Sequence, residues 1–309
     1  MLFLDVQGTL ISDADKSLID GACELVAWLN VRQIPYVIIT NNTKDLNFLQ
    51  NLRQKGLEIK DGAYLDPFFV LKERLKPCKI AAYGASEFKA ALCELGFTLD
   101  YAAPKALLVA SWDAFSFDEF AQMIELAAAG VPLVAMHETS IYKKNGRSYP
   151  GVGAIMQMLK YATNADYAVF GKPSVAFYET ALKMINLQIS GENSRNLEIN
   201  SQNSVKNSLN LAQNSRPAKS VNFSKNSANL AENSLNLSQN SHSTKSVNFS
   251  DILIISDDFK GDLLKARELG MKIVLVLSGK LNSAKGLTLR AGDRVFASVK
   301  EFLAEIKKA

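Results

Sequence analysis

The sequence predicts an α/β fold, in which a doubly wound parallel sheet carries a second, inserted α/β domain. Short apolar segments that suit buried strands alternate along the chain with segments whose apolar residues recur at helical spacing. The connections between them are short, so the alternation indicates right-handed strand–helix–strand units. With 309 residues and 48% hydrophobic content, the chain can bury one large core or two smaller ones.

The first 65 residues are expected to begin the main sheet. A buried strand of apolar residues is followed by the turn residues Gly8 and Thr9, and a second strand rich in β-branched residues is followed by two asparagines. The expected elements are a strand at Leu2–Val6, a helix at Ile19–Gln33, a strand at Tyr36–Thr40 and a helix at Lys44–Lys55.

The middle block, residues 66–166, repeats the alternation and could by itself simply continue the first sheet. Its expected strands are Lys79–Tyr83, Ala106–Ala110 and Pro132–Met136, and its expected helices are Glu87–Leu95 and Phe117–Ala129. The positions of the motifs described below favour a separate cap domain instead. Residues 167–309 then complete the main sheet, with strands at Ala168–Phe170, Asp251–Ser256 and Lys272–Leu277 and helices at Ser174–Ile185 and Gly261–Leu269.

An Asn- and Ser-rich segment interrupts this last part at residues 188–250. It contains a tandem duplication, because NSLNLAQNSRPAKSVNFS from Asn207 recurs as NSLNLSQNSHSTKSVNFS from Asn233. Two such polar copies cannot bury a core, so a disordered surface insertion is expected. His242 lies inside this segment and is expected to be solvated.

Composition argues against several partners and locations. The formal charge is only +4 and no basic run carries interleaved aromatic residues, so no nucleic-acid partner is expected. No segment approaches the roughly 18 uninterrupted apolar residues of a membrane helix, and no targeting segment is expected. The three cysteines, Cys23, Cys78 and Cys93, show no paired spacing and lie in apolar or helical stretches, so buried, reduced thiols in a cytoplasmic protein are expected.

Two polar motifs follow the first two strands. Asp5 opens the sequence Asp-Val-Gln-Gly-Thr-Leu at the carboxyl end of a buried strand, where open α/β sheets bind ligands. An Asp there could also merely cap the turn. Thr40, Asn41 and Asn42 follow the next strand, where a hydroxyl and a backbone N–H can hold a phosphoryl oxygen. They are also ordinary turn residues.

Two further motifs occur late in the chain. Lys172, in Gly-Lys-Pro-Ser, follows a strand and precedes a helix, as an anion-binding lysine would, although a solvated loop lysine has the same pattern. Asp257, Asp258 and Asp262 place three carboxylates within six positions after an apolar strand. Such a cluster needs a counter-charge, which a hard cation can supply, or it can cap a helix.

The four motifs in this order resemble the haloacid dehalogenase superfamily. More narrowly, the chain is similar to its subfamily IIA, the NagD-type phosphatases, which include relatives of 4-nitrophenylphosphatase and phosphoglycolate phosphatase. The phrases at 148–154 and 275–279 share in this likeness. The resemblance covers nearly the whole chain apart from the insertion, and it implies a Rossmann-like core with an α/β cap and phosphoric monoester hydrolysis with Mg²⁺.

The resemblance also implies roles for individual residues. Asp5 would be the nucleophile and a Mg²⁺ ligand, with the carbonyl of Gln7 and Asp257 as further ligands. Asp262 would orient Lys172 or support the metal ligands. Phosphoryl oxygens would be held by Thr40, Asn41, Asn42 and Lys172, and the cap residues His137, Glu138 and Tyr149 would face the leaving group. His137 could equally be a surface loop histidine.

Gln7 departs from the family pattern, which places an acid–base Asp two positions after the nucleophile. An amide cannot exchange a proton at neutral pH, and general acid–base catalysis typically contributes about 10²–10⁴-fold in rate. The chain is therefore expected to be a phosphatase, slow or selective for good leaving groups, acting on sugar phosphates or nucleoside monophosphates. The alternatives are a degenerate relative that binds phosphorylated metabolites or a partner, and a response-regulator-like receiver, against which the inserted block argues. The resemblance is compatible with a homodimer.

Overall fold

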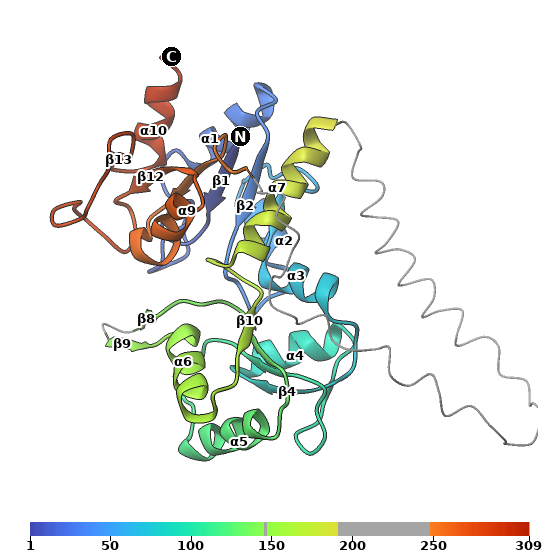
Figure 1. The fold of residues 1–309 in the computed structure, drawn as a ribbon. Helices are drawn as coiled ribbons and strands as arrows, with labels where there is room; N and C mark the ends of the chain where they lie inside the picture. Colours follow the sequence, from blue (N-terminus) through green and yellow to red (C-terminus); the bar gives the residue numbers. More distant parts are fainter. Residues whose placement is uncertain (145–146, 191–247, 309) are drawn as a thin grey trace, which may run out of the picture.

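Two parallel sheets, each with its own helices, make up the computed structural model, which describes residues 1–144, 147–190 and 248–308. Figure 1 shows them one above the other, and the chain passes between them near α3 (Pro67–Arg74) and between β10 (Tyr167–Val169) and α7 (Val175–Ser190). The predicted α/β fold with an inserted cap is confirmed.

The first sheet forms the main domain and has the order β13-β12-β11-β1-β2-β3, with every described pair parallel. Its central strand β1 is buried along its whole length, as a strand covered on both faces must be. The strands are β1 (Leu2–Asp5), β2 (Tyr36–Ile39), β3 (Tyr64–Leu65), β11 (Leu253–Ser256), β12 (Lys272–Val276) and β13 (Arg294–Phe296).

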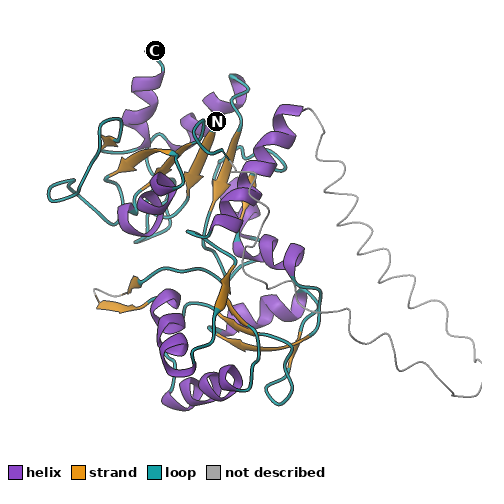
Figure 2. Cartoon of the chain, viewed as in Figure 1, coloured by secondary structure: helices purple, strands orange, loops and turns teal. Residues whose placement is uncertain are grey.

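The helices of the main domain lie on both faces of this sheet (Figure 2). They are α1 (Ala22–Val31), α2 (Phe48–Gln54), α7, a π-helical turn at Phe259–Leu263 followed by α9 (Leu264–Glu268), and α10 (Val299–Ile306). Gly21 precedes α1 at a φ of 88°, where a glycine is favoured. A single helix was predicted at Gly261–Leu269; it instead opens with the π-helical turn.

The second sheet forms the cap and has the order β10-β7-β6-β4-β5, again with parallel pairs. It is built from β4 (Lys79–Tyr83), β5 (Thr98–Leu99), β6 (Leu107–Val109), β7 (Leu133–Ala135) and β10, with helices α4 (Ser86–Glu94), α5 (Phe117–Ala128) and α6 (Val152–Thr163). A hairpin of β8 (Ile141–Lys144) and β9 (Arg147–Pro150) extends from it.

The boundary expected at residue 166 is too early for the cap sheet. β10 pairs with β7 over Tyr167–Val169, so the second sheet ends at Val169. The sequence gives no sign of this, because a short apolar strand before Lys172 suits either sheet. The pairing partner is decided only by which sheet has an open edge.

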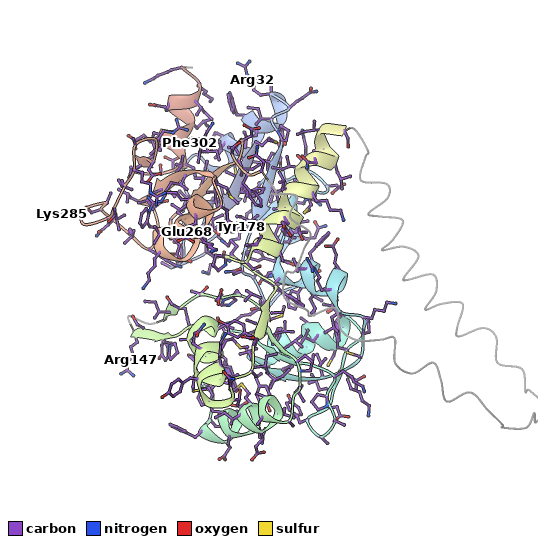
Figure 3. All side chains as sticks on the ribbon, in the orientation of Figure 1. Arg32, Arg147, Tyr178, Glu268, Lys285 and Phe302 are labelled. Carbon is purple, nitrogen blue, oxygen red and sulfur yellow. The ribbon has the colours of Figure 1, made fainter. Side chains whose placement is uncertain are left out.

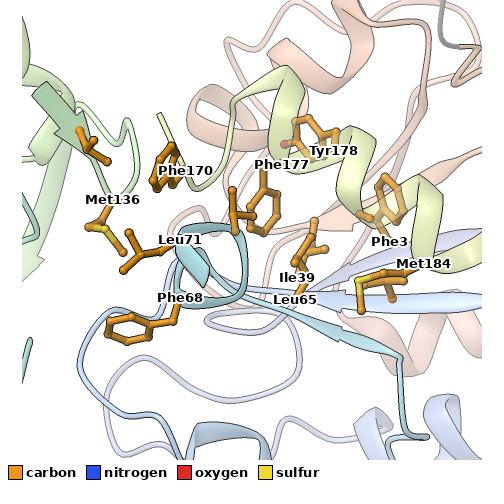
Figure 4. Packing of buried hydrophobic residues seen from close by; sticks show 14 of the residues in the cluster. Phe3, Ile39, Leu65, Phe68, Leu71, Met136, Phe170, Phe177, Tyr178 and Met184 are labelled. Carbon is orange, nitrogen blue, oxygen red and sulfur yellow. The ribbon is translucent and has the colours of Figure 1, made fainter. Parts of the chain in front are cut away.

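One hydrophobic core joins the two domains. Phe68 and Leu71 of α3 and Phe177 and Tyr178 of α7 belong to the same cluster as residues of both sheets, as Figure 4 shows. Tyr178, labelled near the middle of the molecule in Figure 3, stacks on Phe3 of β1 with 6.2 Å between the ring centroids. A second cluster fills the other face of the main sheet under α1 and α10, and a third lies under α5 and α6.

The ends of the predicted 188–250 insertion are part of the fold, which corrects the expected bounds. Gln188 is the last but two residue of α7, and its amide Nε2 donates to the Tyr36 carbonyl at 2.9 Å. Phe249 is 3% exposed and belongs to the core that joins the domains. The remainder of the segment, including the tandem duplication, lies outside the described residues.

No helix within residues 1–144, 147–190 and 248–308 combines the length and the apolar character that crossing a membrane requires.

Replacing Phe249 by Ala should lower the free energy of unfolding by about 3–4 kcal/mol, because it leaves a cavity in the shared core. Phe117 is 90% exposed and offers a matched control, for which the same change should cost less than about 1 kcal/mol. Urea denaturation of the full chain measures both. Equal losses at the two positions would contradict the assignment of Phe249 to the core.

Candidate active site

Polar residues from three strands meet at one edge of the main sheet. Asp5 ends β1, Thr40 follows β2 and Asp257 follows β11. Because β1 pairs in parallel with both neighbours, with Asp5 opposite Ile39 and Leu4 opposite Ile255, the residues that follow these strands reach the same edge. Asp5 is 4% exposed, Thr40 0% and Asp257 1%.

Lys172 is the cation of this edge. Its buried Nζ donates to Oδ1 of Asp5 and, at 2.7 Å, to Oδ2 of Asp262. Burial by itself lowers the pKa of the ammonium group, but Asp262 and Asp5 outweigh burial and hold that pKa above its ordinary value. Lys172 therefore stays charged between the two carboxylates.

Asn41 fixes the backbone that carries Lys172. The Lys172 N–H donates to Oδ1 of Asn41 at 2.8 Å, and Nδ2 of Asn41 donates back to the Lys172 carbonyl at 3.3 Å. Gly171 has no room for a side chain, since a Cβ there would lie 2.4 Å from the Met136 carbonyl oxygen and 2.7 Å from Oδ1 of Asn41. The asparagine side chain thus connects the loop after β2 to the cap–core link.

Asp262 supports Lys172. Its Oδ2 accepts from Lys172 and also from the Ser256 hydroxyl at 2.8 Å. Of the two roles expected for Asp262, its contacts support orientation of the lysine. The π-helical turn at Phe259–Leu263 positions this carboxylate, and π-helical turns often occur at functional sites.

Asp257 lies in a separate, tightly packed niche. Its Oδ2 accepts from the Lys280 N–H at 2.7 Å, and a Cβ on Gly8 or Gly279 would come within 2.2 Å or 2.0 Å of that oxygen. The Ser278 hydroxyl donates to the Gly8 carbonyl at 2.7 Å, so the loop after β12 is tied to the loop after β1. Sequence reasoning missed Lys280, whose Nζ pairs with Asp258.

The two strand-end aspartates lack a full counter-charge. Burial raises the pKa of Asp5 to about 6, against the opposing effect of Lys172. Burial and the charge of Asp5 together raise the pKa of Asp257 to about 8. By contrast, the pKa of Asp258 is lowered, because Lys280 outweighs the effect of burial. Asp5 and Asp257 are therefore the pair in need of a cation.

A divalent cation fits this pair of carboxylates. No group of three or more His, Cys, Asp or Glu side chains in the described part of the chain is arranged to hold a metal. A Mg²⁺ ion, however, is commonly bound through one or two carboxylates and several waters, which requires no larger cluster. Asp5 and Asp257, with the carbonyl of Gln7, are the groups that would hold it.

Gln7 is held by the threonine of the second motif. The Thr40 hydroxyl donates to Oε1 of Gln7 at 3.0 Å, and the Asn42 N–H donates to the same hydroxyl at 3.1 Å. The Asn42 side chain donates to the Asp45 carbonyl and so shapes its own loop. Because its oxygen accepts from Thr40, the amide N–H groups of Gln7 are what remains for a ligand, and they have no hydrogen-bond partner among the residues that the structure describes.

Of the three predicted cap residues, only His137 lines the pocket beside the site, although the Glu138 N–H donates to the Lys172 carbonyl at 3.1 Å. His137 is 5% exposed, and together with Gln7 and Asn41 it lines a pocket of about 810 Å³. Glu138 instead accepts from the Tyr167 hydroxyl at 2.6 Å, and Tyr149 stacks on Tyr142. Neither lines the pocket, whereas Tyr142 and Ser111, which sequence reasoning missed, do.

Comparison with known proteins identifies the family. A model described as haloacid dehalogenase-like hydrolase matches residues 2–98, and one described as HAD-hydrolase-like matches residues 224–302. Together they span more than half of the chain. The chain therefore belongs to the haloacid dehalogenase-like hydrolases, which confirms the family predicted from its motifs.

Individual relatives match this chain at low sequence identity but over more than half of its length. Haloacid dehalogenase-like hydrolase domain-containing protein 2 of Bos taurus is 25% identical over 192 residues, 59% of this chain and 70% of that protein. The acid sugar phosphatase of Staphylococcus haemolyticus is 25% identical over 199 residues, 60% of this chain and 72% of that protein.

Solved structures share the fold. The p-nitrophenyl phosphatase from Archaeoglobus fulgidus superposes with a TM-score of 0.67 at 18% identity, covering 98% of each chain. NagD from E. coli K-12 gives a TM-score of 0.62 at 17% identity, covering 97% of this chain and 96% of that one. These structures have the NagD-type architecture that the motifs predicted.

Acid should destabilise the protein through His137. Burial, with Lys280 and Lys172 nearby, lowers the pKa of this imidazole to about 4, so it is neutral when folded and takes up a proton on unfolding below its ordinary pKa. Stability due to this group is therefore lost as pH falls from about 6.5 toward 4, by about 2 kcal/mol between pH 7 and pH 5. Urea denaturation at pH 7 and at pH 5 measures the free energy of unfolding at each pH. Between the two, His137→Gln should lose about 2 kcal/mol less of this free energy than wild type loses. Parallel losses in wild type and variant would contradict the prediction.

Proposed function

We propose that this protein is a Mg²⁺-dependent phosphatase of small phosphate monoesters, of the sugar-phosphate or nucleoside-monophosphate class, and that it forms an aspartyl-phosphate on Asp5. The observation that carries the proposal is the buried contact of the Lys172 ammonium with Asp5 and Asp262 at the sheet edge shared with Asp257. The phosphatase names of its relatives support the same class of reaction.

Asp5 is the nucleophile in this proposal. Its Oδ1 accepts from Lys172, and its Oδ2 is 3.4 Å from the Thr9 hydroxyl, so the carboxylate is held in one orientation at the edge of the sheet. A carboxylate attacking phosphorus yields an acyl phosphate and releases the leaving-group oxygen. Water then attacks the phosphorus and regenerates the carboxylate.

Lys172 and Thr40 receive the transferring phosphoryl group. Phosphoryl transfer depends mainly on positioning and on neutralising the charge of the equatorial oxygens. The Lys172 ammonium is already placed beside the nucleophile, and Asn41 and Asp262 hold it there. Bound Mg²⁺, held by Asp5, Asp257 and the Gln7 carbonyl, would supply further positive charge to these oxygens.

Gln7 sets the limit on the rate. It can donate a hydrogen bond to a leaving-group oxygen but cannot protonate it, so substrates with good leaving groups are favoured. The same feature favours the alternative function, in which the chain binds phosphorylated metabolites or a partner with little turnover. The contact of Gln7 with Thr40 gives the amide a stable place in either case.

An assay on 4-nitrophenyl phosphate with and without Mg²⁺ tests the proposal. Wild type should turn over the substrate only with Mg²⁺, and Asp5→Asn should abolish turnover. Gln7→Asp should raise kcat by about 10²-fold or more, since it restores an acid–base group. A silent wild type with an active Gln7→Asp would establish the binding function instead.

Mg²⁺ should raise the melting temperature through Asp257. Binding to the folded state alone stabilises it, and Asp5 and Asp257 are the buried carboxylates short of counter-charge. Thermal unfolding is measured with and without MgCl₂ at about 5–10 mM. The melting temperature of wild type should be higher with MgCl₂. Asp257→Asn should lose this shift, whereas Asp20→Asn, at an exposed pair with Lys300, should keep it. A shift retained in Asp257→Asn would place the metal elsewhere.

Location and assembly complete the proposal. Cys23, Cys78 and Cys93 are free thiols, which suits the reducing cytoplasm, although Cys23 and Cys78 are only half-buried and Cys93 is exposed, not buried as expected. The substrate is a small phosphorylated metabolite, and a homodimer through the cap is the assembly that we propose. Light scattering coupled to gel filtration distinguishes this dimer from a monomer.

A further inference from the structure

The pocket beside Gln7 has a marked excess of positive charge at its mouth. Lys16, Lys44 and Lys55 line it, against a single acidic residue, Asp45. The Asp45 carboxylate accepts from the Asn47 N–H at 2.8 Å and from the Asn51 amide at 2.6 Å, so it is occupied by the loop that carries it. A cleft lined mainly by one sign of charge concentrates ligands of the opposite sign.

Two of these lysines are available to a ligand. Nζ of Lys16 lies 3.6 Å from Oδ1 of Asp13. Lys44 and Lys55, by contrast, form no ion pair within residues 1–144, 147–190 and 248–308. Both are exposed and flank the loop and helix that follow the phosphate-binding residues Thr40 and Asn41. Gln7 lies two positions after Asp5 in the chain and lines the same pocket, so a group leaving past Gln7 would enter the field of these two lysines.

The one carboxyl group that lines this pocket, Asp45, already accepts two hydrogen bonds and is not free to serve the leaving group. Gln7 supplies only amide donors, since its oxygen accepts from Thr40. His137 is buried, its Nδ1 lies 3.4 Å from the Thr139 N–H and its Nε2 lies 3.0 Å from the Ser111 hydroxyl, so both ring nitrogens are engaged. Beside Asp5, Gln7 can therefore donate hydrogen bonds to a departing oxygen, but neither Gln7 nor His137 is placed to give it a proton.

These two features select the same kind of leaving group. An alkoxide must be protonated as it departs, which neither Gln7 nor His137 provides for. A phosphate monoester leaves as a stable dianion, because its second pKa is only about 6, and inorganic phosphate leaves as a dianion from pyrophosphate that already carries one proton. A phosphate also carries the negative charge that Lys44 and Lys55 are placed to receive.

We propose that the preferred substrate is a phosphoanhydride, with the terminal phosphoryl group at Asp5 and the leaving phosphate between Lys44 and Lys55. The inference rests on the proposed function, because it uses the same nucleophile. Inorganic pyrophosphate and a nucleoside diphosphate share this chemistry. A volume of about 810 Å³ accommodates either.

The reaction balances without an added acid. Asp5 attacks the terminal phosphorus, the bond from that phosphorus to the bridging oxygen breaks, and the bridging oxygen departs with the electron pair as part of the leaving phosphate. Water then attacks the aspartyl-phosphate at phosphorus, the bond to Asp5 breaks, and the carboxylate is restored. The proton lost by water remains on the phosphate products or passes to solvent.

Substrate comparison on the full chain with Mg²⁺ gives the first test. We expect kcat/KM for pyrophosphate or ADP to exceed that for glycerol 3-phosphate by about 10²-fold or more, since only the alkyl ester depends on the missing acid. Comparison of kcat/KM for pyrophosphate with kcat/KM for ADP shows which of the two anhydrides is preferred. Glycerol 3-phosphate turned over as well as both anhydrides would overturn the inference.

Variants give the second test. Lys44→Gln/Lys55→Gln should lower kcat/KM for the anhydride about tenfold more than that for 4-nitrophenyl phosphate, which lacks a second anion. Lys76→Gln/Lys285→Gln is the matched control, since both lysines are exposed and outside the pocket (Lys285 is labelled in Figure 3), and it should change neither value. Equal losses on the two substrates in the pocket variant would overturn the role of the lysines.

The Gln7→Asp variant tests the effect of the missing acid separately from that of the lysine charges. It should raise kcat/KM for glycerol 3-phosphate at least tenfold more than that for the anhydride. Turnover of 4-nitrophenyl phosphate without preference for anhydrides would reject the inference and leave the proposed function standing. No Mg²⁺-dependent turnover of any of the four substrates would reject both.

Discussion

The buried ion pairs of Lys172 are the interaction on which the arrangement of this protein depends. One ammonium group contacts a carboxylate from the first strand and another from the turn after β11, so it connects residues 5, 172 and 262. Removing one partner of such a buried pair typically costs about 3–5 kcal/mol, because it leaves a charge without compensation. The position of Lys172 also fixes where the cap joins the core, since the lysine directly follows the last cap strand.

The arrangement leaves a second charge problem at Asp257. This carboxylate is packed between Gly8 and Gly279 and receives one backbone N–H, but Lys172 is already occupied by its two partners. An enzyme that must bind phosphate cannot neutralise every carboxylate internally. Two under-compensated aspartates at one edge are the basis of the cation site that we propose, and a bound cation would in turn attract an anion.

The cap contributes less to the chemistry than to the shape of the site. Its sheet shares a core with the main domain through α3 and α7, so it is packed against the core by aromatic side chains and not only linked to it. His137 and Ser111 close one side of the pocket, while the lysines of the other side come from the main domain. Gln7, which also lines this pocket, is held by the Thr40 hydroxyl.

Much of the fold could be predicted from the sequence because it depends on local pattern. β4 has the predicted bounds, and the strand that ends at Asp5 and those that precede Thr40 and Asp257 were predicted within two residues, since buried parallel strands are short runs of apolar residues. The two-residue strands β3 and β5, the hairpin and β13 were missed, because so few residues carry no periodicity.

The sequence by itself determined the order of the motifs, the type of fold and the identity of the charged groups. Only the tertiary structure decided which groups meet: that Asp262 contacts Lys172, that β10 joins the cap sheet, and that Glu138 bonds to Tyr167 and not to the pocket. The physical reason is that alternation and composition are properties of neighbours in the chain. Contacts between residues 29 or 90 positions apart depend on strand pairing and core packing, which no local pattern specifies.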